Sequence, residues 1–359
     1  MAEWLKAAVL KTVERLRVPG VRIPPPPPPC KGAVVPAARE TSGNHILVAK
    51  DKTRFIDAMF AQNIFTQLAA WQAEGLATGL ATLIAIDGSS PRPRGAQIGV
   101  AEDGRHIGII SSGCAEEAII AETLDALSSG DNRITRYGKD SPYLDIVLPC
   151  GSGLDILFSG IGVAELTQAA CALHAQRQTA YVTLSGDNRL AVSADAEPSG
   201  NHPPLAYTPD YHLHVFGAGP QLVYFAKLAQ SMGYRVFART TDDAALTALK
   251  DIGLDAAPMT HQTQFEPDVF DEYSAIITLF HEHNLEIPIL EAALNSKAHY
   301  IGALGSRKTH AQRRDVLSLR QTQRPFEDII GPIGLDIGAT DPTEIALSIM
   351  AQIVEKRRA

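Results

Sequence analysis

The chain has 359 residues and a formal net charge of −8, with 45% hydrophobic and 20% charged residues. This is the composition of an ordinary globular protein, and it excludes a disordered or fibrous one. Residues 1–54 carry ten Lys and Arg against four Asp and Glu, whereas the other 305 residues carry 22 against 36. An acidic body argues against a general nucleic-acid binder, which needs a basic surface to displace counterions.

The four cysteines, at positions 30, 114, 150 and 171, have neither the density of a disulfide framework nor the spacing of a zinc finger. Reduced thiols in a cytoplasmic protein are the simplest interpretation. No apolar run approaches the roughly 20 residues that a membrane helix needs. We therefore expect a cytoplasmic protein with no membrane and no nucleic acid among its partners.

The chain divides into three parts. Six consecutive prolines at 24–29 favour extended polyproline II, so residues 1–54 are predicted to be a disordered, proline-rich extension. A polar, proline-rich stretch at 185–210 is the expected boundary between two folded domains, which we place at 55–200 and 205–359. Lengths of this order are typical of single domains.

The first domain mixes helices and strands. Asp103-Gly104 between alternating apolar residues predicts a hairpin. The apolar spacing predicts helices at 55–73, 115–127 and 164–176, and strands at 80–86, 97–101, 106–111, 145–148, 154–158 and 180–184. This part is therefore predicted to be an N-terminal α/β domain.

The second domain alternates strands and helices more regularly. Strands are predicted at 212–216, 234–238, 275–279 and 300–302, and helices at 221–232, 286–295 and 342–356. Such alternation predicts a Rossmann-like, doubly wound parallel sheet. Asp341-Pro342-Thr343-Glu344 has the residues of an N-cap, a proline at the first helical position and a capping box at the start of the last helix.

A glycine turn follows the first strand of this domain. Gly217-Ala-Gly219 stands between a strand and a helix, as in a dinucleotide fingerprint, where glycines let the backbone approach a phosphate at the helix N-terminus. Leu222 stands where the fingerprint has Gly or Ala, and Arg239-Thr240-Thr241 stands where an acidic residue would bind ribose. Arg239 could instead meet a phosphate. An NAD(P)-dependent oxidoreductase is therefore the alternative function.

Cys114 lies between a predicted strand and a predicted helix, within Ser112-Gly113-Cys114-Ala-Glu116. A helix N-terminus lowers the pKa of a cysteine, so Cys114 is a candidate thiolate that could bind a soft metal or accept sulfur. The alternative is an ordinary buried cysteine, the more frequent role of this residue type.

Two further loops of the first domain could bind an anion. The loop 88–95 contains Ser89, Ser90, Arg92 and Arg94, whose hydroxyls and guanidinium groups suit a phosphate or a pterin-like ligand. A solvated turn is the alternative. The loop Cys150-Gly-Ser-Gly153 follows a predicted strand, and either function or turn geometry explains its glycines.

The second domain offers three more candidates. His281 follows the strand 275–279, at the edge where parallel sheets bind ligands. Gly305-Ser306-Arg307 is a strand-to-helix turn with positive charge for an anion. Asp336 lies between two glycines that the adjoining cap does not explain.

Together these segments resemble the XdhC/CoxI family of molybdenum-enzyme accessory proteins, from about residue 60 to the C-terminus. The resemblance rests on Asp87-Gly-Ser-Ser-Pro-Arg92, Ser112-Gly-Cys114-Ala-Glu116, Cys150-Gly151, Phe216-Gly-Ala-Gly219, Tyr300-Ile-Gly-Ala-Leu-Gly-Ser-Arg-Lys308, Pro332-Ile-Gly-Leu-Asp-Ile-Gly338 and Glu344-Ile-Ala-Leu-Ser-Ile. It implies a chaperone that binds the molybdenum cofactor, supports its sulfuration and inserts it into an apo molybdenum hydroxylase of the xanthine dehydrogenase type. A cysteine desulfurase would supply the sulfur, and the chaperone would be a homodimer. A scaffold that only contacts the client enzyme is a third interpretation.

The resemblance also implies roles for individual residues. Cys114 would be the catalytic residue and would face the molybdenum, with Cys150 beside the cofactor. Ser89, Ser90, Arg92, Arg94 and Gly113 would hold the pterin phosphate or the cytosine nucleotide extension of the dinucleotide form. Any nucleotide in the second domain would meet Gly217, Gly219, His281, Gly305, Ser306, Arg307 and Asp336. The chain departs from the family at Ser112, usually glycine, at Phe280-His281, usually Thr-His, and at Thr240-Thr241, usually an acidic pair.

Overall fold

The computed structural model describes residues 64–113, 115–141, 151–196, 203–260, 263, 265–280 and 283–358, with the side chains of residues 283 and 284 left aside. These residues all belong to one unit of the chain, Ala49–Ala359. The predicted extension at 1–54, the predicted strand at 145–148, and Cys114, Cys150 and His281 lie outside the described residues.

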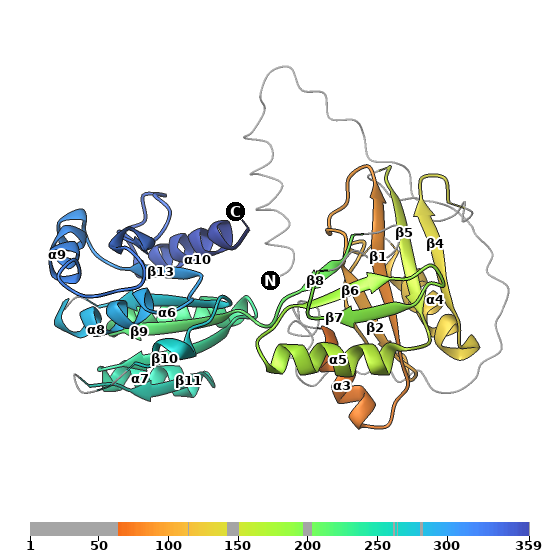
Figure 1. Ribbon diagram of the computed structural model, residues 1–359, viewed down its shortest axis with the longest axis horizontal. Coiled ribbons are helices and arrows are strands. Elements are labelled where there is room, and N and C mark those ends of the chain that lie inside the picture. Colours follow the sequence, from red (N-terminus) through yellow and green to blue (C-terminus); the bar gives the residue numbers. More distant parts are fainter. Residues whose placement is uncertain are drawn as a thin grey trace, which may run out of the picture. The chain divides into compact units, whose positions relative to one another are not determined.

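The first part of the chain is built on a five-stranded antiparallel sheet in the order β3-β2-β1-β5-β4 (Figure 1). Its central strand is almost entirely buried, since elements cover both of its faces. Ala81 and Leu83 pack with the helix that follows Cys114, and Leu80, on the opposite face, packs with two other helices. This alternation is the period of two that a strand imposes. The strands are β1 (Thr78–Asp87), β2 (Gln97–Ala101), β3 (His106–Gly108), β4 (Asn132–Gly138) and β5 (Gly153–Ser159), and the helices are α3 (Ile64–Ala73), α4 (Glu116–Ser129) and α5 (Val163–Ala175).

A second, three-stranded antiparallel sheet has the order β7-β6-β8. Its strands are β6 (Ala180–Leu184), β7 (Leu190–Ser193) and β8 (Leu205–Tyr207). The last two lie inside the stretch 185–210 that composition alone identified as an interdomain boundary. Both pair with β6, so this stretch completes the first part of the chain.

The second part is a six-stranded, wholly parallel sheet in the order β11-β10-β9-β12-β13-β14. Counted from its own first strand, the order is 3-2-1-4-5-6, that of the dinucleotide-binding Rossmann fold. The predicted doubly wound sheet is confirmed. The strands are β9 (His212–Gly217), β10 (Arg235–Thr240), β11 (Asp255–Pro258), β12 (Ser274–Leu279), β13 (Tyr300–Ala303) and β14 (Ile329–Ile330).

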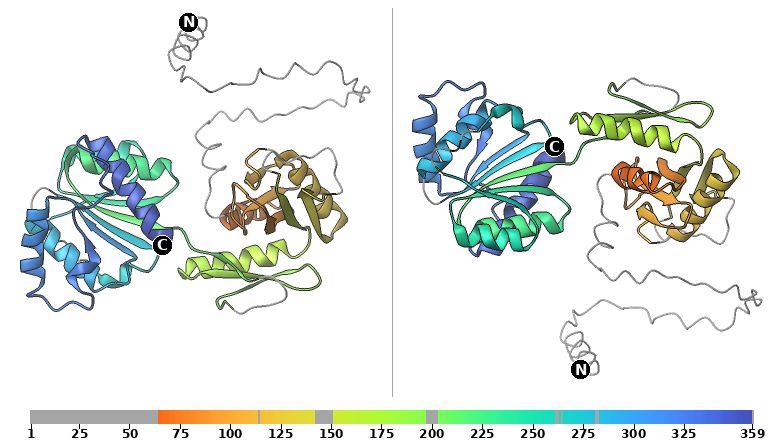
Figure 2. Two further views of the ribbon diagram at one scale, coloured as in Figure 1. Left: turned by 90° about the horizontal axis from the view of Figure 1, so that it is seen from above. Right: turned by 90° about the horizontal axis from the view of Figure 1, so that it is seen from below.

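Helices pack on both faces of this parallel sheet (Figure 2). One face carries α6 (Gly219–Ser231), α7 (Asp243–Asp251) and α10 (Pro342–Arg358), whereas α8 (His283–Leu294) and α9 (Arg307–Leu317) belong to the other face. The connection from β11 to β12 contains only a short 3₁₀ turn, Pro267–Val269, among its described residues. On the face that carries α8 and α9, the β11–β12 connection therefore places no helix over β9, β10 and β11 among its described residues.

Several elements were not predicted, and the missing signal differs among them. The strand β11 reads Asp-Ala-Ala-Pro, which has no apolar alternation. Helix α9 reads Arg-Lys-Thr-His-Ala-Gln-Arg-Arg-Asp-Val-Leu and buries only Arg313 and Leu317. By contrast, the predicted cap of α10 is confirmed, because the Asp341 carboxylate accepts the Thr343 N–H at 2.8 Å and Glu344 accepts the N–H of Asp341.

Candidate functional site

Two of the predicted loops meet at one end of the antiparallel sheet. Asp87, the last residue of β1, pairs with Gly153, the first residue of β5. The loop 88–95 therefore leaves the sheet where the chain that follows Cys150 enters it. A Cβ atom added at Gly88 would lie 3.3 Å from the Cβ of Ser152, so the two loops are in van der Waals contact.

The chain on either side of Cys114 reaches the same core cluster. Ile110 and Ala115 flank the Cys114 segment, and both are buried in one apolar cluster with Ala96 and Leu154. Ala96 directly follows the loop 88–95, and Leu154 is the fourth residue after Cys150. Three segments far apart in the sequence are thus anchored on one cluster. The positions of Cys114 and Cys150 themselves stay predictions.

Glu116 organises the turn that carries Cys114. Its carboxylate accepts hydrogen bonds from the backbone N–H groups of Ile110 at 3.2 Å, Ser111 at 2.6 Å and Gly113 at 2.6 Å, and from the Ser111 hydroxyl. Burial acts to raise the pKa of Glu116, but the hydrogen bonds from Ser111, Gly113 and Ile110 outweigh it and the net shift is downward. This positioning role of Glu116 could not be predicted, because it depends on a loop conformation that the sequence does not specify.

Ser112 occupies a left-handed backbone conformation, with φ of 61°. This conformation is unfavourable by roughly 1–2 kcal/mol for residues with a Cβ atom, but not for glycine. The left-handed backbone therefore explains why the family usually has glycine at this position.

The substitution Ser112→Gly is expected to raise the free energy of unfolding by up to about 1 kcal/mol, because relief of the left-handed strain exceeds the added entropy of the unfolded chain. Urea denaturation followed by circular dichroism measures it. Ser112→Ala keeps the Cβ atom and serves as the matched control, which should show no gain. A loss of stability in Ser112→Gly would contradict this assignment of strain.

The two arginines of the loop 88–95 have different environments. Arg94 donates from Nε to the carbonyl of Ile84 at 2.8 Å and from a terminal nitrogen to the carbonyl of Pro203, so part of its guanidinium fastens the loop. Arg92 is exposed, and no hydrogen bond or ion pair engages its side chain in the described part of the chain. Ser90 accepts the backbone N–H of Arg92 at 3.3 Å, and Ser89 is exposed.

Both arginines line a cavity of about 650 Å³, which we call the arginine cavity. Arg357 and Arg358 of α10 line it as well, and no Asp or Glu is among its described lining residues. Gly108 and Ile109, which lead toward Cys114, form part of its wall. Arg92 and Arg358 are exposed, whereas the Arg357 guanidinium lies over the rings of Tyr211 and Tyr234, 5.7 and 5.5 Å from their centroids. Four cationic side chains in one lining make the local potential positive on an acidic protein. Arg357 and Arg358 were not predicted, because the sequence alone shows them only as the basic end of a helix.

The glycine turn of the parallel sheet has a structural cause. A Cβ atom at Gly217 would lie 2.7 Å from the carbonyl oxygen of Leu279, so only glycine lets β9 and β12 approach this closely. The N–H of Gly219, which would meet a phosphate in a dinucleotide site, donates instead to the Asp242 carboxylate at 3.1 Å. Hydrogen bonds from Ala245, Gly219 and Ala244, the first the strongest, hold the pKa of Asp242 below its usual value despite some desolvation. A negative charge thus already occupies the turn.

Arg239 does not face this turn. Its guanidinium donates to the carbonyl of Ala238 at 2.8 Å and to the Asp255 carboxylate at 3.2 Å. These contacts of Arg239 do not support the alternative in which it binds a phosphate at the glycine turn.

The turn Gly305-Ser306-Arg307 lies over a buried ion pair. Ser306 caps α9 by accepting the N–H of Thr309 at 3.2 Å, and Arg307 is exposed. A Cβ atom at Gly305 would lie 3.2 Å from the guanidinium of Arg313. Arg313 donates to both carboxylate oxygens of Glu286, at 2.6 and 3.0 Å, and to the carbonyl of Leu304. The helix that carries Glu286 was predicted, but its partner Arg313 was not, because the two residues lie 27 positions apart.

Asp336 is exposed, and the described residues provide it with no hydrogen bond or ion pair. The preceding Gly334 is held by Gln352, which accepts its N–H at 2.9 Å and donates to its carbonyl at 3.1 Å. Gly334 has φ of 100°, and a Cβ atom there would lie 2.4 Å from the hydroxyl oxygen of Ser348, so backbone conformation together with packing favours glycine. The structure does not join Asp336 to the glycine turn by any contact among the described residues.

No group of three or more His, Cys, Asp and Glu side chains is arranged for a metal ion within the described ranges. Among the helices that the structure describes, none has the length and apolar character to span a membrane.

Comparison with known proteins confirms the resemblance. Residues 213–353 match the XdhC Rossmann domain, and residues 71–138 match the XdhC and CoxI family. The chain is 32% identical over 283 residues to the molybdenum cofactor insertion chaperone PaoD of Escherichia coli strain K12, across 77% of this chain and 83% of that protein. It is 25% identical over 338 residues to a probable xanthine dehydrogenase subunit from Bacillus subtilis strain 168, across 82% of this chain and 98% of that protein.

A crystal structure described as a xanthine dehydrogenase from Bacillus halodurans has the same fold. The TM-score is 0.64 at 21% sequence identity, covering 82% of this chain and 95% of that one. With its parallel sheet, its antiparallel sheet and a relative at 32% identity, this chain belongs to the XdhC and CoxI family.

Proposed function

We propose that this protein binds the molybdenum cofactor as cargo, supports its sulfuration and inserts it into an apo molybdenum hydroxylase of the xanthine dehydrogenase type. The arginine cavity carries this proposal, because four arginines line it beside the chain that leads to Cys114, and two of them, Arg92 and Arg358, are exposed. The similarity to the insertion chaperone PaoD supports the same cargo. A cysteine desulfurase would supply the sulfur in the cytoplasm, and the chaperone would act as a homodimer.

The chemistry of the cavity suits the phosphate end of a pterin cofactor. Arginine binds phosphate oxygens through paired N–H donors, and the described lining residues include no carboxylate that would repel a phosphate. Its volume of about 650 Å³ lies in the range of small-molecule sites, roughly 300–1,000 Å³. A cytosine nucleotide extension would add a second phosphate for the same donors.

Cys114 is proposed as the group that faces the molybdenum. It directly precedes the N-terminal end of α4, where the helix dipole favours a thiolate. The chain from Ile109, a wall residue of the arginine cavity, to Cys114 is five residues long and spans at most roughly 18 Å. Cysteine thiolate is a soft ligand suited to such a metal.

The alternative, an NAD(P)-dependent oxidoreductase, has the Rossmann strand order in its favour. The Asp242 carboxylate on the Gly219 N–H opposes it, because a dinucleotide pyrophosphate would meet a like charge there. The absence of saturable NADH and NADPH binding in fluorescence titrations would remove this alternative.

The double variant Arg92→Glu/Arg358→Glu is expected to lose at least tenfold in affinity for the molybdenum cofactor, because two exposed cations of the cavity become anions. The measurement is the molybdenum and oxidised pterin retained after incubation and gel filtration. Arg189→Glu/Arg314→Glu, which alters two exposed arginines outside the cavity lining, is the matched control. Equal retention by the cavity variant and the wild type would overturn the assignment of this cavity.

The variant Cys114→Ala is expected to retain the pterin but to lose most sulfuration of the cofactor, because the proposed metal-side thiolate is gone. Activation of an apo hydroxylase in the presence of a cysteine desulfurase measures sulfuration. Cys171→Ala is the control, since Cys171 lies in α5 and burial raises the pKa of its thiol. Full activation by Cys114→Ala would remove this residue from the mechanism.

A further inference from the structure

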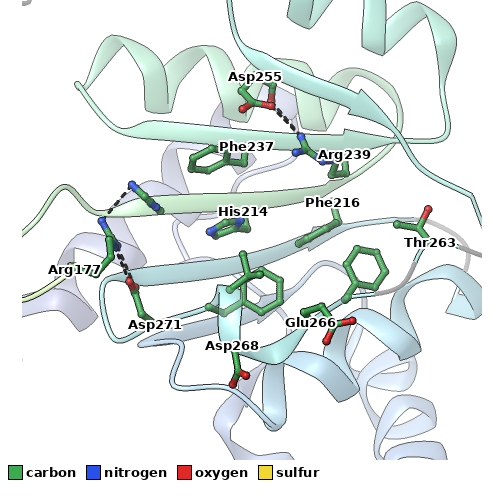
Figure 3. A pocket seen from close by; sticks show the side chains of 14 residues that line it. Arg177, His214, Phe216, Phe237, Arg239, Asp255, Thr263, Glu266, Asp268 and Asp271 are labelled. Atoms are coloured by element: carbon green, nitrogen blue, oxygen red, sulfur yellow. Dashed lines mark hydrogen bonds and ion pairs between the residues drawn. The ribbon is translucent and has the colours of Figure 1, made fainter. Parts of the chain in front are cut away.

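A second cavity lies on the face of the parallel sheet that the β11–β12 connection leaves without a helix (Figure 3). Its volume is about 620 Å³, and we call it the aromatic pocket. His212, His214 and Phe216 reach it from alternate positions of β9, and Phe237 and Arg239 from β10. Alternate residues of a strand share one face, so the floor of the pocket is the sheet itself.

The walls of the aromatic pocket are flat rings. The ring of His214 stacks on that of Phe237, with centroids 5.0 Å apart and an interplanar angle of 13°. Phe270 meets the same histidine edge-on at 4.9 Å, and Phe265 meets Phe216 edge-on at 5.2 Å. Planar apolar walls of this kind favour a planar ligand, which can stack on or contact the ring edges.

His214, which lines this pocket, carries a buried hydrogen-bonding atom. The residue is 8% exposed, and its Nε2 atom has no hydrogen-bond partner among the residues that the structure describes. A buried polar atom without a partner is unfavourable and rare in native proteins. Burial, together with the nearby His212, lowers the pKa of His214 to about 4, so its imidazole is neutral near pH 7. A neutral imidazole nitrogen suits an uncharged heterocyclic partner.

The charges at the pocket exclude an anionic ligand. Arg239 is paired with Asp255, and Arg177 is paired with Asp271 (Figure 3). Glu266 and Asp268 remain exposed at the rim, with no ion pair among the described residues. The lining therefore carries a net negative charge, opposite in sign to that of the arginine cavity.

We propose that the aromatic pocket binds an uncharged, planar amino-heterocycle of the kind found in nucleobases and pterins. The ring would lie among the phenylalanines, and exocyclic amino groups would face the acidic rim. One ring nitrogen or N–H would bond His214 Nε2, which is shielded from solvent here and would be uncovered by a small rotation of the imidazole. The pocket volume suits a single such ligand. This site is distinct from the arginine cavity and does not depend on the molybdenum cofactor being the cargo.

Equilibrium dialysis of the full chain with adenosine, cytidine, guanosine and free pterin tests the proposal and distinguishes its two ligand sources. At least one of the four is expected to bind saturably at one site per chain. The matching nucleoside monophosphate should bind at least threefold more weakly, because the rim is acidic. No saturable binding of any of the four compounds up to millimolar concentration would overturn the proposal.

The substitution His214→Phe keeps a ring in the stack, removes Nε2 and is expected to weaken binding about tenfold. His106→Phe, at an exposed histidine of the β2–β3 hairpin, is the matched control. Unchanged affinity in His214→Phe would overturn the proposal. If that variant does not fold, ¹⁵N NMR spectra of the histidines in the wild-type protein test the proposal instead. Adding the ligand should shift the resonance of one imidazole nitrogen. Unchanged spectra would overturn the proposal.

The variant Arg92→Glu/Arg358→Glu separates the two proposals. It should bind the uncharged heterocycle as well as the wild type does, even where it has lost the molybdenum cofactor. A parallel loss of heterocycle binding in this variant would assign the ligand to the arginine cavity and overturn the aromatic pocket.

Discussion

Replacing Glu286 with leucine is expected to lower the free energy of unfolding by about 3–5 kcal/mol, because it leaves the buried Arg313 guanidinium without its counterion. The Glu286 side chain is 0% exposed and that of Arg313 is 1% exposed, and two hydrogen bonds of 2.6 and 3.0 Å join them. Thr278 also donates to the carboxylate, at 3.3 Å. Urea denaturation followed by circular dichroism at pH 7 measures the change.

Two controls distinguish loss of the ion pair from loss of volume. The double variant Glu286→Leu/Arg313→Met removes both charges and is expected to recover most of the stability, as apolar replacements of buried pairs do. Asp328→Leu breaks a half-exposed pair with Arg324, joined at 2.6 Å, and should cost at most about 1 kcal/mol. A single Glu286→Leu variant as stable as the wild type would show that Arg313 does not need this carboxylate.

Acidification between pH 6.5 and 5 is expected to destabilise the protein through His212 and His214. Burial is the main cause that lowers the pKa of each to about 4, from an ordinary value of 6.5. The unfolded chain therefore binds more protons than the folded one between these values, and stability falls as the pH falls. The contribution of the two neutral histidines to the free energy of unfolding is complete above about pH 6.5 and is lost as the pH falls toward 4. The slope approaches about 1.4 kcal/mol per pH unit for the buried His214 and less for the half-buried His212.

Urea denaturation at pH 7, 6 and 5 measures this slope, and His214→Phe should reduce it by roughly half. His106→Phe, at an exposed site, should leave it unchanged. Carboxylates with lowered pKa, such as Glu116 and Asp271, also lose stabilisation on acidification, but only as the pH falls below their ordinary values near 4. The window above pH 5 therefore isolates the histidines, to which His310 adds a smaller contribution because burial lowers its pKa as well. A flat profile between pH 7 and 5 would contradict the buried, neutral state of His214.

Much of the fold was predictable because its signals are local. The turn at Gly217–Gly219 between β9 and α6, and the cap Asp341–Glu344 of α10, each depend on residues within a few positions of one another. Strands β2 and β6 were predicted at their observed bounds, Gln97–Ala101 and Ala180–Leu184. The edge strands β7, β8 and β11 were missed, because they are stabilised by pairing with a distant neighbour rather than by their own composition.

The candidate site divides in the same way. Local pattern identified the loop 88–95 and the Cys114 turn as candidates, and the structure anchors both on one core cluster. It did not identify Arg357 and Arg358, which lie more than 260 positions after Arg92 and meet it only across the arginine cavity. Gly217, which was predicted to meet a nucleotide, is required by its close contact with the backbone of Leu279. Gly334, which the cap of α10 did not explain, has a positive φ of 100° and lies against Ser348.

By itself the sequence determined the two-part α/β organisation, the Rossmann-like alternation and the family resemblance, since hydrophobic period, caps and turn residues act over a few positions. Only the tertiary structure decided which charges meet. Arg313 pairs with Glu286, 27 positions away, and the Gly219 N–H donates to the Asp242 carboxylate. The Nε2 atom of His214 is buried without a hydrogen-bond partner in the part of the chain that the structure describes. These outcomes depend on long-range packing, because residues far away in the sequence surround each of these polar atoms.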